Sequence, residues 1–125
     1  MTGKKHTAEK WLDITIKALR ESLIKEGVGG SGELKGSIRG KVNAQGIDDV
    51  RSIELYYRFY GKFIDMGVGR KARDGGFGKR TAKEWYSSVI GRRVYELSSI
   101  MINVYGAEAV ARIMESLPGK VEIEM

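Results

Sequence analysis

The segment LYYRFYGKFIDMGVGRKARDGGFGKR, Leu55 to Arg80, constrains the fold more than any other part of the chain. Five of its aromatic residues fall within eight positions: Tyr56, Tyr57, Phe59, Tyr60 and Phe63. Aromatic side chains favour the pleated, half-buried surface of a sheet, so residues 51–66 are predicted to form a strand. The second half of the segment contains five glycines. Because glycine loses the most conformational entropy on ordering, residues 67–80 are predicted to form an exposed, flexible loop.

This glycine-rich loop also carries most of the excess charge of the chain. Its net charge is +4 of a total of +6, with one acidic residue, Asp74, against Arg70, Lys71, Arg73, Lys79 and Arg80. Cationic side chains on a flexible backbone can follow a phosphate chain without reading bases, and Phe77 could stack on a base. The alternative is a loop that pairs with acidic groups of a neighbouring subunit or stays solvated. A nucleotide-binding loop is disfavoured because Lys79 is followed by arginine, not by serine or threonine.

Length and composition indicate a single domain over residues 1–125. A chain of 125 residues buries about two-thirds of its unfolded surface on folding. No apolar run approaches the ~20 residues of a membrane span, so no membrane partner is expected. The chain has no cysteine, which excludes disulfides, thiolate catalysis and cysteine-based zinc sites. Synthesis in the cytoplasm is the simplest interpretation.

The N-terminal part predicts one amphipathic helix over residues 7–27. Its apolar stripe repeats every three or four positions: Leu12, Ile16, Leu19 and Leu23. Thr7 is the expected N-cap and Gly27 the expected stop. Residues 1–6 are then a flexible tail, and residues 27–36, GVGGSGELKG, a flexible connector.

The remaining elements complete an α+β pattern. Strands are expected over residues 37–42 and 120–125, with the last one returning to the edge of the sheet, and Ile53 and Leu55 should share its buried face. A long helix is expected over residues 81–105, with Trp85 and Tyr86 as core anchors. A shorter helix over residues 107–117 should follow. We therefore predict a small, mainly antiparallel sheet packed against an N-terminal helix and a long C-terminal helix.

Few residues suit catalysis or a cofactor, so we expect no enzyme, no metal and no cofactor. His6 is the only histidine and lies in the expected tail. Asp48 and Asp49 are adjacent, which is more typical of a turn than of a metal pair. Asp65 stands in an apolar context, where we expect it to accept hydrogen bonds from amides of the following glycine turn or to pair with Arg70. A strongly perturbed Asp65 in a cleft would instead indicate an enzyme.

Two short motifs resemble the tail-component, or neck, family of tailed bacteriophages. The first is a Thr/Ser-Gly-x-Leu-x-x-Ser-Ile segment, matched by Ser31, Gly32, Leu34, Ser37 and Ile38. The second is a strand end, Tyr-(Ala/Gly)-x-(Phe/Val)-(Val/Ile)-(Glu/Asp)-x-Gly, matched by Tyr60, Gly61, Phe63, Ile64, Asp65 and Gly67. The resemblance covers most of residues 7–105. Many family members carry a Pro-x-Arg-Pro-Phe segment before the last helix, where this chain has GFGKRTAKEWY.

The resemblance implies a structural virion protein of a phage or prophage, made and assembled in the cytoplasm of the bacterial host. Such proteins act in head-to-tail joining or tail completion, as connector, neck or minor tail components. The implied partners are neck, portal-adaptor or tail proteins, further copies in a homo-oligomeric ring, and DNA in the lumen through non-specific contact. A small nucleic-acid-binding module that uses the basic loop is the alternative function.

Overall fold

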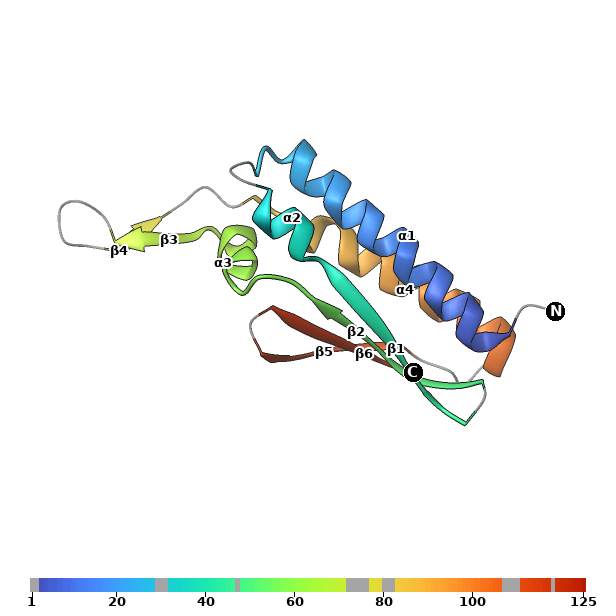
Figure 1. The fold of residues 1–125 in the computed structure, drawn as a ribbon. Helices are drawn as coiled ribbons and strands as arrows, with labels where there is room; N and C mark the ends of the chain where they lie inside the picture. Colours follow the sequence, from blue (N-terminus) through green and yellow to red (C-terminus); the bar gives the residue numbers. More distant parts are fainter. Residues whose placement is uncertain are drawn as a thin grey trace.

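The body of the protein has two layers, seen in a computed structural model (Figure 1). Two long helices lie side by side on one face of a four-stranded antiparallel sheet. The helices are α1 (Lys4–Lys25) and α4 (Ser87–Tyr105). The strand order is β1-β2-β6-β5, formed by β1 (Arg39–Gln45), β2 (Asp49–Tyr56), β5 (Arg112–Leu117) and β6 (Lys120–Glu124). This arrangement confirms the predicted α+β class.

Shorter elements connect the two layers. The chain passes through the short helices α2 (Glu33–Ser37) and α3 (Tyr60–Met66). A separate two-stranded sheet consists of β3 (Val68–Lys71) and β4 (Phe77–Lys79). The structure describes residues 3–28, 32–46, 48–71, 77–79, 83–106, 111–117 and 119–125.

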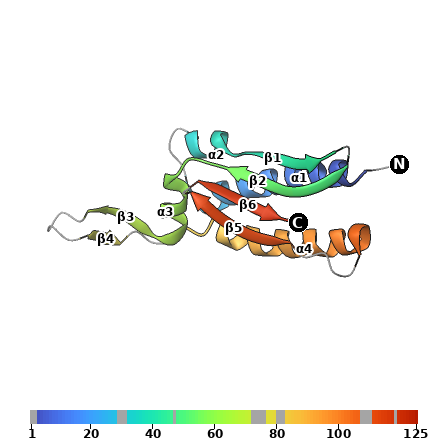
Figure 2. The same cartoon turned by 90° about the horizontal axis from the view of Figure 1, so that it is seen from below.

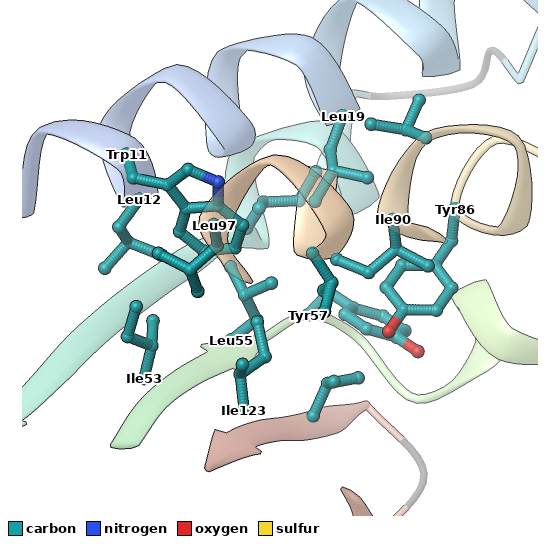
Figure 3. Packing of buried hydrophobic residues seen from close by; sticks show 14 of the residues in the cluster. Trp11, Leu12, Leu19, Ile53, Leu55, Tyr57, Tyr86, Ile90, Leu97 and Ile123 are labelled. Atoms are coloured by element: carbon teal, nitrogen blue, oxygen red, sulfur yellow. The ribbon is translucent and has the colours of Figure 1, made fainter. Parts of the chain in front are cut away.

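One face of the sheet forms the floor of the hydrophobic core. Ile53 and Leu55 on β2 are fully buried, as predicted, and Ile123 of β6 lies directly opposite Ile53. Side chains of α1 and α4 point down onto this floor (Figure 3), among them Trp11, Leu12, Leu19 and Leu97. Burying one such side chain contributes about 1.5–3 kcal/mol. The core therefore depends on strict alternation along β2 and β6.

The opposite face of the sheet points away from both helices (Figure 2). By the strand register it carries charged and polar residues, among them Lys41, Glu54 and Glu122. Glu54 forms the centre of this face, because it pairs with Lys120 at 3.2 Å and accepts a hydrogen bond from the Tyr56 hydroxyl at 2.6 Å. The hydrogen bond from Tyr56, followed by the contact with Lys120, lowers the pKa of Glu54. Single-sided burial of this kind is common in antiparallel sheets.

A side-chain network fixes α1 against α4. The Trp11 indole donates to the Arg93 carbonyl at 2.9 Å, and the Arg93 guanidinium lies 5.5 Å from the centroid of the Trp11 ring. Arg93 also donates to the Thr15 hydroxyl at 3.0 Å. Thr15 is fully buried, so this contact satisfies a polar group inside the helix pair.

The predicted strand over residues 51–66 is wrong in its second half. β2 ends at Tyr56, and Tyr60–Met66 is the helix α3. Gly61 and Asp65 are the buried residues of this helix, while Tyr60 and Ile64 pack against the core. Each pair is four residues apart, which is a helical period. The aromatic residues of this stretch, which a strand would place on both of its sides, lie on the inner and outer faces of the helix α3.

The predicted helix over residues 107–117 is also wrong for the described part. Residues 107–110 lie outside the described residues, and Arg112–Leu117 forms β5. β5 pairs with β6, so β6 is an interior strand and not the predicted edge. An isolated helix of that length is marginal, whereas pairing with β6 satisfies a whole edge of backbone groups.

The remaining differences concern element ends. α2 occupies part of the predicted connector 27–36, and β1 begins at Arg39, two residues later than expected. α4 begins at Ser87, later than expected, with residues 81–82 outside the described chain. α1 begins at Lys4, so His6 belongs to the helix, and Thr7 is not its N-cap.

Asp48, from the turn between β1 and β2, takes the capping role at the start of α1. Its carboxylate accepts the backbone amides of Lys5 at 2.8 Å and Lys4 at 2.9 Å. These two hydrogen bonds lower the pKa of Asp48. The first amides of a helix have no partner within the helix, so Asp48 satisfies them from a distant strand connection.

The cap predicts a pH-dependent effect of Asp48→Asn. Because the pKa of Asp48 is lower in the folded state, the cap stabilises the fold fully at pH values above the unfolded pKa of about 3.9. This stabilisation is lost as pH falls through the pKa of the folded state. The variant should therefore be less stable than the original chain at pH 7, and the difference should shrink as pH falls below the unfolded pKa of about 3.9. Urea denaturation across that range measures it. A difference that stays constant with pH would contradict the cap.

Candidate interaction surface

A two-stranded ribbon, which we call the arm, extends from one end of the body (Figures 1 and 2). The arm consists of β3 and β4, paired antiparallel with Val68 opposite Lys79 and Lys71 opposite Phe77. The sequence predicted a flexible loop here. The described backbone instead forms a ladder, because pairing satisfies amides and carbonyls that a loop would leave to water.

The arm carries most of the predicted polyanion- or partner-facing residues. Arg70 and Lys71 lie on β3, and Phe77 and Lys79 lie on β4. Arg73 and Arg80 lie outside the described residues. The fold thus brings Arg70, Lys71, Phe77 and Lys79 together on one ribbon, which sequence spacing alone could not establish.

Both ends of the arm are held at the C-terminal end of α3. Gly67 ends this helix with a φ of 77°, a left-handed conformation that favours glycine. The Ile64 carbonyl accepts the amide of Gly67 at 3.3 Å and that of Lys83 at 3.1 Å, on the returning chain. One carbonyl therefore joins the outgoing and returning ends.

Asp65 strengthens this junction by capping α4. Its carboxylate accepts the backbone amides of Tyr86 at 3.0 Å and Ser87 at 2.8 Å, and the Ser87 hydroxyl donates to its second oxygen. Asp65 is buried. The predicted amides were wrong, since they come from the start of α4 and not from the glycine turn, and the alternative partner, the Arg70 side chain, lies outside what the structure describes. The predicted kind of role, a carboxylate that accepts backbone amides, is confirmed.

An aromatic cluster supports α3 from inside the core. Trp85 is fully buried and donates its indole N–H to the Gly61 carbonyl at 2.9 Å. The Tyr57 ring stands edge-on to Trp85 with centroids 5.1 Å apart, and Tyr86 lies 5.7 Å from Tyr57. Burial raises the pKa of both tyrosines, which keeps them neutral. The prediction that Trp85 and Tyr86 anchor the core is confirmed.

The two sequence motifs meet at this junction. The Ser37 hydroxyl donates to the Leu34 carbonyl at 2.6 Å and accepts the Arg58 amide at 3.0 Å. A Cβ added at Gly61 would lie 2.8 Å from a Leu34 methyl group and 2.9 Å from the Trp85 ring. Residues 33–38 and 58–67 therefore form one structural unit, which supports the arm.

Sequence reasoning missed an apolar stripe on the exposed side of this unit. Phe59, Phe63 and Met66 are spaced four and three residues apart, so they lie along one face of α3. Phe59 is 60% exposed and Met66 is 57% exposed. Helical spacing was the available signal, but it was hidden by interpreting the segment as a strand.

The described residues contain little that points to chemistry. They include no group of three or more metal-ligating side chains, and His6 is exposed on α1. A groove of about 450 Å³ between α1 and α4 is lined by residues of mixed charge, among them Glu21, Lys25 and Arg92. None of the helices in the described chain is long and apolar enough to cross a membrane.

Comparison with known proteins does not assign the chain to a group. No family model, curated protein or solved structure matches it.

The tight contact at Gly61 predicts that a larger residue destabilises the fold. Gly61→Val should lower the free energy of unfolding by about 1–3 kcal/mol, because the new side chain overlaps Leu34 and Trp85. Gly91→Ala is the control, since nothing lies within 4 Å of a Cβ there and the position is inside α4. It should raise stability by about 0.5–1 kcal/mol. Urea denaturation of both variants measures this, and a neutral Gly61→Val would show that the site can expand.

The capping role of Asp65 predicts a graded series. Asp65→Ala leaves two amides without an acceptor and should cost about 1–3 kcal/mol. Asp65→Asn keeps one carbonyl oxygen and should cost less, and Asp13→Ala at an exposed position should stay within about 0.5 kcal/mol of the original. Thermal and urea denaturation measure the order. Unchanged stability in Asp65→Asn with loss of function would assign Asp65 a chemical role instead.

Proposed function

We propose that this chain is a structural virion protein of a tailed phage or prophage, acting in head-to-tail joining or tail completion as a ring subunit. The observation that carries the proposal is the unit at the base of the arm. The residues that resemble the neck family, from Leu34 to Ile38 and from Tyr60 to Gly67, are the ones that support the arm. In this proposal the residues of both motifs have a structural role and no catalytic role.

The isolation of the arm supports an assembly function. Its main contact with the rest of the described chain is that of β3 with α3. A two-stranded ribbon is marginally stable in water by itself, so a neighbouring molecule would stabilise it. The apolar stripe of Phe59, Phe63 and Met66 at its base adds exposed surface of the kind that protein partners cover.

Partners in this proposal are neck, portal-adaptor or tail proteins and further copies of the chain. Subunits that contact each other through two different surfaces form a ring when the rotation between them closes, and a ring suits a junction crossed by DNA. The protein would be made and assembled in the host cytoplasm and incorporated in the virion. Enzymatic activity, a metal and a cofactor form no part of the proposal.

The charge of the arm favours one alternative, a non-specific nucleic-acid-binding module. The segment from Gly67 to Arg80 has a net charge of +4. In that function Arg70, Lys71 and Lys79 would contact phosphates as the main task, and affinity would fall steeply with salt.

Light scattering coupled to size exclusion separates the two functions. We expect a closed oligomer, or a monomer indifferent to duplex DNA, at both low and moderate salt. Arg70→Glu combined with Lys71→Glu tests the arm, and Lys10→Glu with Lys17→Glu on exposed positions of α1 is the charge-matched control. The assembly function would be contradicted by a monomer that binds any duplex at low salt, if the arm variant no longer binds the duplex and the control variant still does.

A further inference from the structure

The four-stranded sheet ends in two strands with free edges. β1 and β5 each have a neighbour on one side only, among the described residues. An exposed edge presents unpaired amides and carbonyls, and a second chain can pair with them. The two edges differ in charge and in the burial of their apolar residues, and these differences indicate which chain would pair with them.

Strand direction makes the two edges compatible with each other. β1 is antiparallel to β2, β2 to β6, and β6 to β5, so β1 and β5 run in opposite directions. A second copy in the same orientation would therefore place its β1 antiparallel to β5 of the first. The helices of both copies would stay on the same side of a continuous sheet.

The buried row of the sheet is incomplete at the β5 edge. Across the four strands this row runs from Val42 through Ile53 and Ile123 to Ile113, each directly opposite the next. The two central residues are fully buried, whereas Ile113 is 40% exposed. Pairing with β1 of another copy would continue the row with an apolar residue, Val42, and cover Ile113.

The flank of α4 above β5 is apolar and exposed as well. Arg93 marks the side of α4 that faces α1. At 100° per residue, Tyr95 and Ile102 lie about 200° and 180° around the helix from Arg93. Tyr95 is 75% exposed and Ile102 is 42% exposed. A copy that extends the sheet would bring its α1 toward this flank.

Charge distinguishes this pairing from a symmetric one. β1 carries Arg39 and Lys41 and no acidic residue, and both are exposed. β5 carries one arginine, Arg112, and one glutamate, Glu115, so its net charge is zero. Two β1 edges would repel each other, whereas β1 against β5 joins a basic edge to a neutral one.

We infer that the β5 edge of one subunit pairs with the β1 edge of a second copy, which continues the antiparallel sheet from subunit to subunit. The inference rests on the proposed function, because a heterologous edge pairing repeated around an axis gives a ring. It goes further by naming the two strands and the face that each copy turns to its neighbours.

Cysteine cross-linking tests the pairing directly, because the chain has no cysteine of its own. Lys41, Glu54, Glu122 and Met114 form one row on the polar face, with Lys41 and Met114 at its two ends. Opposed residues in neighbouring strands have Cα atoms about 4.5–5.5 Å apart, within disulfide reach. Met114→Cys is mixed with Arg39→Cys, Lys41→Cys or Asn43→Cys, so that three registers are covered.

From one of these mixtures we expect a disulfide-linked dimer that contains one copy of each variant. When both cysteines are placed in one chain, we expect a ladder of disulfide-linked oligomers. Glu122→Cys replaces Met114→Cys as the control, because it lies on an interior strand and should not cross-link to β1. Ile113→Lys should abolish the cross-link while circular dichroism stays unchanged.

Three other outcomes overturn the edge pairing, and a fourth overturns only the proposed function. Homodimers of Met114→Cys alone would show two β5 edges paired about a two-fold axis. Light scattering that finds an oligomer without any cross-link would place the ring interface elsewhere and leave the proposed function standing. A monomer without cross-links would overturn the edge pairing, whereas cross-linked oligomers that do not complete phage tails would uphold it and overturn the proposed function.

Discussion

Because α1 and α4 cover a single face of the sheet, every central strand must present apolar residues to one side and polar residues to the other. The row from Val42 to Ile113 satisfies the first requirement, and Glu54 with its contacts to Tyr56 and Lys120 satisfies the second. The sheet does not close on itself, so β1 and β5 each keep one edge without a neighbour among the described residues, and the arm extends from one end of the body. The partial exposure of Ile113, which the proposed pairing would cover, lies at the outer end of this apolar face.

The arm is attached to the body at the junction of α3 and α4. Ile64 joins the two ends of the arm through one carbonyl, and Asp65 caps α4 from α3. Gly61 lets Trp85 approach the backbone closely. These contacts hold both ends of the arm at one place on the body, which suits the assembly function proposed above.

Periodic burial explains which elements could be predicted from sequence. The stripes of α1 and α4 and the alternation of β2 and β6 were long enough to be recognised. The stretches over residues 60–66 and 112–117 were misassigned because each is short. Three or four apolar positions match a helix or a strand almost equally well, and the choice depends on contacts with Trp85 or with β6.

The sequence by itself determined the α+β class, the two long helices, the buried face of β2 and the concentration of basic residues between Gly67 and Arg80. These are local properties, since they depend on the spacing and charge of neighbouring residues. Only the tertiary structure decided that Asp48 caps α1, that Asp65 caps α4 and that β6 lies inside the sheet. Each of these contacts joins residues distant in the chain. Backbone amides and strand edges need hydrogen-bond partners, and the packing of the whole chain decides which partner reaches them.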